Sequence, residues 1–171
     1  MLKEIHFVSY QQFLALQGRA DTIAISITDR LYEGTVAEGY HDVLRLQFAD
    51  YDPVRDTPLT CQHPFTPVHA ALVREWITVH HAAAVPLILL VHCWAGISRS
   101  AAIAWWAHQK FGAALKTRYP AYHLNRFVLH QLDGAMAAPP IPAGSPSREQ
   151  LIHEFTRQGS YVAEHAGGRH R

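Results

Sequence analysis

The most constraining feature of this sequence is a six-residue run, Pro86–Val91 (PLILLV), in which every residue is apolar. A strand that alternates apolar and polar residues has one face in water, whereas a strand without polar residues is buried on both faces. Strands of that kind occur in parallel sheets that are covered by helices on both sides. The run therefore predicts the central strand of an α/β domain.

Two further segments are typical of strands. Thr22–Thr28 (TIAISIT) is rich in β-branched residues, and Asp42–Phe48 (DVLRLQF) alternates apolar and polar residues. Because such runs alternate with longer helical patterns, we expect an α/β fold: a central, mostly parallel sheet of four to five strands flanked by helices. The other predicted elements are a short strand at His6–Ser9 and helices at Tyr10–Gln17, Thr66–Ala83, Ser98–Phe111, Ala121–Met136 and Arg148–His165.

Proline-rich segments predict how the chain is divided. Ala138–Pro146 (APPIPAGSP) cannot form a helix. We therefore expect a main domain at residues 1–137, a linker at 138–146, and a helix and tail at 147–171. Ser147 is the expected cap of that last helix, which would pack on the domain or on a second copy of the chain in a homodimer. Asp50–Pro64 is predicted to be a long surface loop, a type of segment that often carries function.

Charge and cysteine content argue against several classes of protein. A formal net charge of +1, with His neutral, gives no long-range attraction to nucleic acid or a membrane surface. Two cysteines, Cys61 and Cys93, are too few for a disulfide framework. The first residues lack the pattern of a secretory signal, and no apolar run is long enough to cross a bilayer. The 13 histidines are scattered without metal-ligand spacing. We expect a cytoplasmic protein with reduced thiols, no metal and no cofactor.

The segment Leu89–Ser100 (LLVHCWAGISRS) carries the clearest signs of a catalytic site. The central strand is predicted to end at His92, the Cys93–Arg99 loop follows, and a helix comes next. A loop that leads into a helix N-terminus points several backbone N–H groups into one small space, which suits a phosphate. Arg99 can donate two parallel hydrogen bonds to phosphate oxygens. We therefore predict an oxyanion site formed by Arg99 and by Trp94, Ala95, Gly96, Ile97 and Ser98.

The same positive field is expected to act on Cys93, the first residue of the loop. A free thiol has a pKa near 8.5, and a helix N-terminus with nearby cations can lower it to about 3.5–7.5. The thiolate is the nucleophilic form of cysteine. Ser100 is expected to hydrogen-bond the sulfur, and His92 is expected to brace the loop through a hydrogen bond.

The nine residues His92–Ser100 (HCWAGISRS) resemble the H-C-x5-R-[ST] signature of the protein tyrosine and dual-specificity phosphatases. In the order of its elements, the resemblance extends from about Ile5 to Met136. It implies that residues 1–137 are a catalytic domain that hydrolyses phosphomonoesters through a phosphocysteine, without a metal. Cys93 is then the nucleophile, Arg99 binds the phosphate, and Ser100 helps the sulfur to leave.

The resemblance also implies a general acid, an aspartate that follows a strand a few tens of residues before the nucleophile. Asp50 fits this position best, because it comes directly after the predicted strand Asp42–Phe48. Asp52 is the alternative acid, and Asp56 is a third candidate. Each of them can instead be a solvated turn residue, as Asp commonly is.

The uncharged loop positions bear on the substrate. Phosphoinositide phosphatases of the superfamily often carry lysines where this chain has Trp94, Ala95 and Ile97. The expected partners are therefore a phosphorylated protein or a small phosphoester, with phosphotyrosine favoured, and inorganic phosphate or another oxyanion in the loop. Trp94 either flanks an aromatic substrate or packs within the protein.

Some alternatives stay open at this point. A non-catalytic module could bind a phosphorylated partner through the same loop, and a sulfur-transfer enzyme could carry a persulfide on Cys93. Cys61 could pair with oxidised Cys93 and protect it. Asp29 and Arg30 are expected to form an ion pair below the site.

Overall fold

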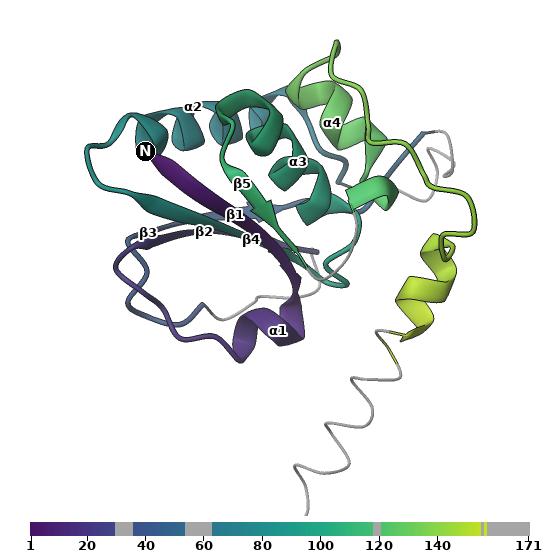
Figure 1. Ribbon diagram of the computed structural model, residues 1–171, viewed down its shortest axis with the longest axis horizontal. Helices are drawn as coiled ribbons and strands as arrows, with labels where there is room; N and C mark the ends of the chain where they lie inside the picture. The colour runs from purple at the N-terminus through teal and green to yellow at the C-terminus, as the bar shows by residue number, and fades with distance from the viewer. Residues whose placement is uncertain (30–35, 54–62, 118–120, 155, 157–171) are drawn as a thin grey trace, which may run out of the picture. The chain divides into compact units, whose positions relative to one another are not determined.

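Five parallel strands form the framework of the protein. The computed structural model describes residues 1–29, 36–53, 63–117, 121–154 and 156. One sheet has the strand order β3-β2-β4-β1-β5, with every neighbouring pair parallel. The α/β class with a parallel central sheet is thus confirmed (Figure 1). The strands are β1 (Leu2–Ser9), β2 (Thr22–Thr28), β3 (Asp42–Gln47), β4 (Leu87–Cys93) and β5 (Ala114–Lys116).

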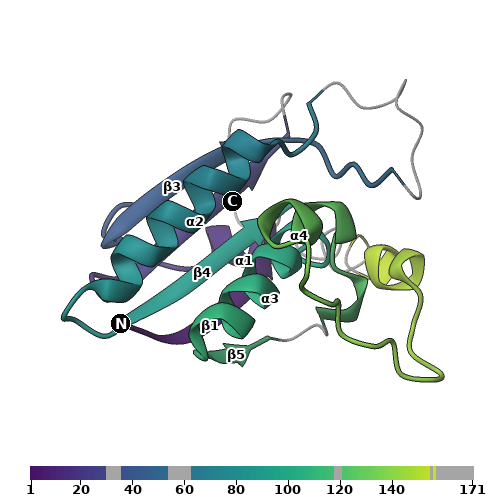
Figure 2. The ribbon, with the colours of Figure 1, turned by 90° about the horizontal axis from the view of Figure 1, so that it is seen from above.

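Helices cover both faces of this sheet. Figures 1 and 2 show α2, α3 and α4 on one face and the short α1 on the other. Strand β4 lies between β1 and β2, and six of its seven residues are buried, as its apolar sequence predicts. The helices are α1 (Tyr10–Leu14), α2 (Pro67–Ala82), α3 (Arg99–Phe111) and α4 (Arg126–Leu132), with a 3₁₀ turn, η2 (Ala121–His123), before α4.

Several predicted elements have other bounds in the structure. The strand predicted at His6–Ser9 begins at Leu2, because β1 pairs with β4 along its whole length. The helix predicted at Tyr10–Gln17 ends at Leu14. The three-residue strand β5, which pairs only with β1, was not predicted.

The helix predicted at Ala121–Met136 is wrong. The backbone of Asn125 is extended, with φ −69° and ψ 108°, and that residue caps a shorter helix, α4. At the other end, Asp133 is extended as well. The break after η2 therefore creates a helix N-terminus that the apolar pattern did not reveal.

Helix α2 lies where it was predicted, but the residues that it buries are not the apolar residues from which it was predicted. Thr66 caps the helix, and the buried residues are Ala70, Val73 and Ile77. The helix was predicted from apolar residues three or four positions apart, Val68, Leu72, Trp76 and Val79. Three of these are exposed: Val68 by 68%, Leu72 by 46% and Val79 by 63%.

The chain divides into two units, Met1–Pro140 and Ile141–Arg171. The first contains the sheet. In the second, residues 148–154 and 156 are helical. Ser147 caps this helix as predicted: its Oγ accepts from the backbone N of Gln150 at 3.2 Å, and its own backbone N donates to Gln150 Oε1 at 2.6 Å. The rest of the helix predicted up to His165 lies outside the described residues.

Candidate active site

Parallel pairing brings the candidate residues to one edge of the sheet. Cys93 is the last residue of β4, and it lies beside Ser9, the last residue of β1. Asp29 directly follows β2, and Asp50 comes three residues after the end of β3. The carboxyl ends of parallel strands are the usual place for a ligand in an open α/β sheet.

The Cys93–Arg99 loop packs tightly against the end of β1. Gly96 has φ +68°, in the left-handed region that favours glycine. A Cβ at this position would lie 2.3 Å from the backbone N of Ser9 and 2.4 Å from the carbonyl carbon of Val8. Only glycine fits this turn without moving the backbone.

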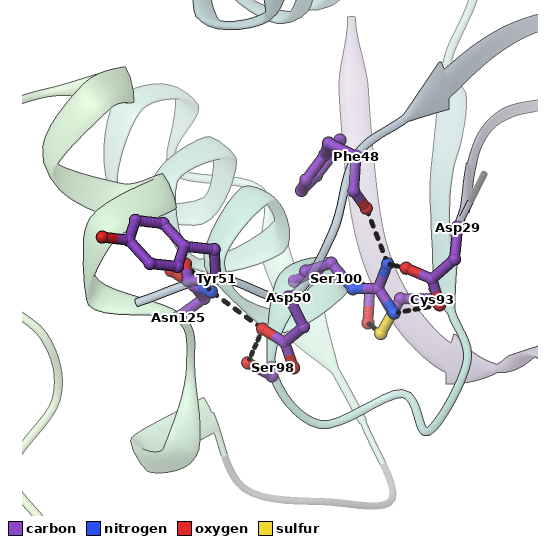
Figure 3. A network of polar contacts seen from close by, with 9 residues as sticks. Asp29, Phe48, Asp50, Tyr51, Cys93, Ser98, Ser100 and Asn125 are labelled. Carbon is purple, nitrogen blue, oxygen red and sulfur yellow. Dashed lines mark hydrogen bonds and ion pairs between the residues drawn. The ribbon is translucent and has the colours of Figure 1, made fainter. Parts of the chain in front are cut away.

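Cys93 and Ser100 are in direct contact beneath the loop. The distance between Cys93 Sγ and Ser100 Oγ is 3.1 Å, and both residues are buried. The predicted contact between this hydroxyl and the sulfur is therefore present (Figure 3). A hydroxyl in this position can donate a hydrogen bond to a thiolate.

Arg99 is held by one edge of its guanidinium. Nη1 donates to Asp29 Oδ1 at 2.5 Å and to the carbonyl oxygen of Phe48 at 2.8 Å, and Nη2 donates to Asp29 Oδ2 at 3.4 Å (Figure 3). The side chain is 5% exposed. Asp29, which was expected to pair with Arg30, thus pairs with Arg99; Arg30 itself lies outside the described residues.

The other edge of the same guanidinium is suited to an oxyanion. Nε of Arg99 is buried, and it has no hydrogen-bond partner among the described residues. In the planar guanidinium, Nε–H and one N–H of Nη2 point in the same direction, which is the geometry that binds two oxygens of a phosphate. A buried donor without a partner is costly, so a bound anion would satisfy it.

The electrostatics of Arg99 fit an anion site. Burial lowers its pKa, but the nearby charges of Cys93, Asp50 and Asp29 outweigh burial and raise the pKa above its ordinary value. The guanidinium therefore stays charged although it is buried.

His92 is neutral and fixed below the loop. It is fully buried, and burial, together with the positive charge of Arg99, lowers its pKa to about 4. Its Nε2 lies 2.8 Å from Ser26 Oγ in β2, and its ring stacks on Phe13 with the ring centroids 4.0 Å apart. This hydrogen bond ties the end of β4 to β2.

Of the three candidate acids, Asp50 contacts the Cys93–Arg99 loop. Its Oδ1 accepts hydrogen bonds from Ser98 Oγ at 2.7 Å and from Asn125 Nδ2 at 2.8 Å (Figure 3). Asp52 is buried, with 4% of its surface exposed. Asp56 lies outside the described residues, as does Cys61.

Asn125 is a site residue that the sequence analysis missed. Asn is a common N-cap residue, so an Asn before the apolar pattern of α4 was a usable signal. Because a single helix was predicted across Ala121–Met136, Asn125 was placed inside that helix instead of at its start.

The remaining loop residues differ in what they offer a ligand. Ile97 is fully buried, so only its backbone can face an anion. Trp94 is 52% exposed and lies nearly parallel to the ring of Tyr10, with the centroids 6.4 Å apart. These two rings line an open hollow together with Ile27, Thr28 and Asp29.

Among the described residues, no group of three or more His, Cys, Asp or Glu side chains could hold a metal ion. In the same part of the chain, none of the helices has the length and apolarity needed to cross a bilayer. A scan against protein-family models finds no match, and neither do searches of curated proteins and of solved structures.

Proposed function

We propose that the protein is a phosphoric monoester hydrolase of the protein tyrosine or dual-specificity phosphatase type, acting through a phosphocysteine intermediate. The observation that carries this proposal is the buried Nε of Arg99, which has no hydrogen-bond partner in the described structure. Arg99 is the last residue of the loop whose first residue is Cys93. The Ser100 hydroxyl at 3.1 Å from the Cys93 sulfur supports it. An anion-binding edge and a nucleophile are thus combined in one loop.

The reaction has two steps. In the first, the Cys93 thiolate attacks phosphorus, a P–S bond forms, and the P–O bond to the leaving group breaks while Asp50 donates a proton to the leaving oxygen. In the second, the Asp50 carboxylate takes a proton from water, whose oxygen attacks phosphorus and displaces the sulfur. Ser100 donates a hydrogen bond to that sulfur as it becomes a thiolate again. Arg99 and the loop amides stabilise the phosphoryl oxygens in both steps.

The hollow beside the loop favours aryl phosphates as substrates. Its aromatic walls, Tyr10 and Trp94, can contact the ring of a phosphotyrosine. Asp29 links this hollow to the anion site, because the same side chain lines the hollow and binds Arg99. Phosphoserine, phosphothreonine and small phosphoesters are the other substrates to compare.

The test is hydrolysis of phosphotyrosine and phosphoserine peptides and of an aryl phosphate under reducing conditions. We expect turnover that Cys93→Ser abolishes and that the matched variant Cys61→Ser retains, because Cys61 is the only other cysteine of the chain. Tight phosphopeptide binding without turnover by the unmodified protein would identify a non-catalytic phosphate-binding module instead. Thiosulfate–cyanide turnover without phosphatase activity would indicate a sulfur-transfer enzyme.

A further inference from the structure

Asn125 uses all of its polar groups to join three segments of the protein. Its backbone N donates to the carbonyl oxygen of Ser98 at 3.1 Å, and its Oδ1 accepts from the backbone N of Val128 at 2.9 Å. Its Nδ2 donates to Asp50 Oδ1 at 2.8 Å and to the carbonyl oxygen of Tyr51 at 3.0 Å. The residue is fully buried, so water cannot replace these contacts.

The neighbours of the side-chain amide determine its orientation. The backbone N of Val128 can only donate, and the carbonyl oxygen of Tyr51 can only accept. Rotating the amide by 180° would place N–H against N–H on one side and oxygen against oxygen on the other. The amide nitrogen of Asn125 therefore faces Asp50.

Ser98 supplies a second donor to the same carboxylate oxygen. It occupies the N-cap position of α3, where a serine hydroxyl commonly accepts a backbone hydrogen bond from the first turn. Here its side chain makes no such bond and donates to Asp50 Oδ1 at 2.7 Å instead. Asp50 is thereby attached both to the Cys93–Arg99 loop and, through Asn125, to the start of α4 (Figure 3).

We propose that Asn125 is a positioning residue that, together with Ser98, fixes Asp50 over the Cys93–Arg99 loop for proton transfer. This inference rests on the proposed function. Both hydrogen bonds reach the same oxygen, Oδ1 of Asp50. The contacts run entirely between protein groups, so the position of the acid does not depend on contacts with the substrate.

The test compares two aryl phosphates whose phenols differ in acidity. A strongly acidic phenol leaves without a proton, whereas a weakly acidic phenol needs one. Asn125→Ser retains a hydroxyl that can cap α4 but is too short to reach Asp50. We expect kcat to fall by about 10- to 100-fold for the weakly acidic phenol and by less than about 3-fold for the acidic one, since general acid catalysis is worth about 10²–10⁴-fold in full. Ser98→Ala, which leaves the α4 cap in place, is expected to show the same dependence on the leaving group.

A double-mutant cycle separates positioning from a purely structural role. In the background of Asp50→Ala, Asn125→Ser is expected to cause no further loss, because the group it positions is gone. Equal losses for both phenols, or a full loss in the Asp50→Ala background, would overturn the inference. Thr66→Ala, which removes the cap of α2, is the control for lost helix capping without a change at Asp50.

The controls also distinguish this inference from the proposed function. If the unmodified protein hydrolyses neither ester, the proposed function fails and the inference fails with it. If the unmodified protein is active and Asp50→Ala keeps full activity toward the weakly acidic phenol, the inference and the role of Asp50 as the acid are overturned, while the phosphatase proposal, which rests on Cys93 and Arg99, stands.

Discussion

Gly96 offers a quantitative test of how tightly the Cys93–Arg99 loop is packed, because the chain contains a matched control. Gly96 and Gly112 both have φ +68°. A Cβ on Gly112 would meet no atom within 4 Å, whereas one on Gly96 would lie 2.3 Å from the backbone of Ser9. Alanine at either position therefore adds the same left-handed strain, and only at Gly96 does it add a collision.

The two contributions have different magnitudes. Left-handed backbone costs a non-glycine residue about 1–2 kcal/mol, which is the expected loss of unfolding free energy for Gly112→Ala. Forcing an extra methyl group into a packed interior adds about 1–3 kcal/mol. We therefore expect Gly96→Ala to lose about 2–5 kcal/mol, partly relieved if the loop moves away from β1. For a chain of this size, each kcal/mol lowers Tm by about 2–4 °C.

The assay measures denaturant unfolding and aryl phosphate turnover for both variants. We expect Gly112→Ala to keep the turnover of the unmodified protein and Gly96→Ala to lose most of it, since displacing the loop separates the backbone amides from Arg99. Equal stability losses with equal turnover would refute this reasoning, because they would mean that the loop does not rest on the end of β1.

Further predictions concern the groups around the loop. The unfolding free energy should fall by up to about 3 kcal/mol as the pH drops from about 6.5 to about 4, because His92 binds a proton in the unfolded chain but not when it is buried in the folded protein. In urea titrations, His92→Gln should remove this part of the dependence of stability on pH. Asp29→Asn should weaken phosphate binding about 3- to 10-fold in calorimetry, because it weakens the contact that holds the guanidinium of Arg99 in place. Tighter phosphate binding by this variant would show that Asp29 mainly repels the anion. Trp94→Ala should lower kcat/KM about 2- to 10-fold for an aryl phosphate but not for an alkyl phosphate, whereas equal losses would exclude a contact with the substrate ring.

The sequence is most informative where one local pattern determines the structure. A six-residue apolar run is short for a helix and typical of a buried strand, and β4 covers most of it. The β-branched segment Thr22–Thr28 forms a strand with the predicted bounds. Gly112 ends α3 in the left-handed conformation expected of a helix-ending glycine.

Local sequence patterns could not predict contacts between residues that are far apart in the chain. Asp29 binds Arg99, which lies 70 residues away in the sequence. Likewise, Asn125 lies 75 residues from Asp50 and meets it only because α4 starts beside the loop after β3. On α2, two sets of apolar residues have helical spacing, and packing buries Ala70, Val73 and Ile77 while Val68, Leu72 and Val79 stay exposed.

The most direct test of the central claim is a crystal structure of the protein with orthovanadate, which mimics a phosphoryl group in transfer. We predict vanadium bonded to Sγ of Cys93, with two of its oxygens hydrogen-bonded to Nε and Nη2 of Arg99 and with the Asp29 contact retained. Vanadate bound elsewhere, or Arg99 turned away from an anion that Cys93 holds, would contradict the account.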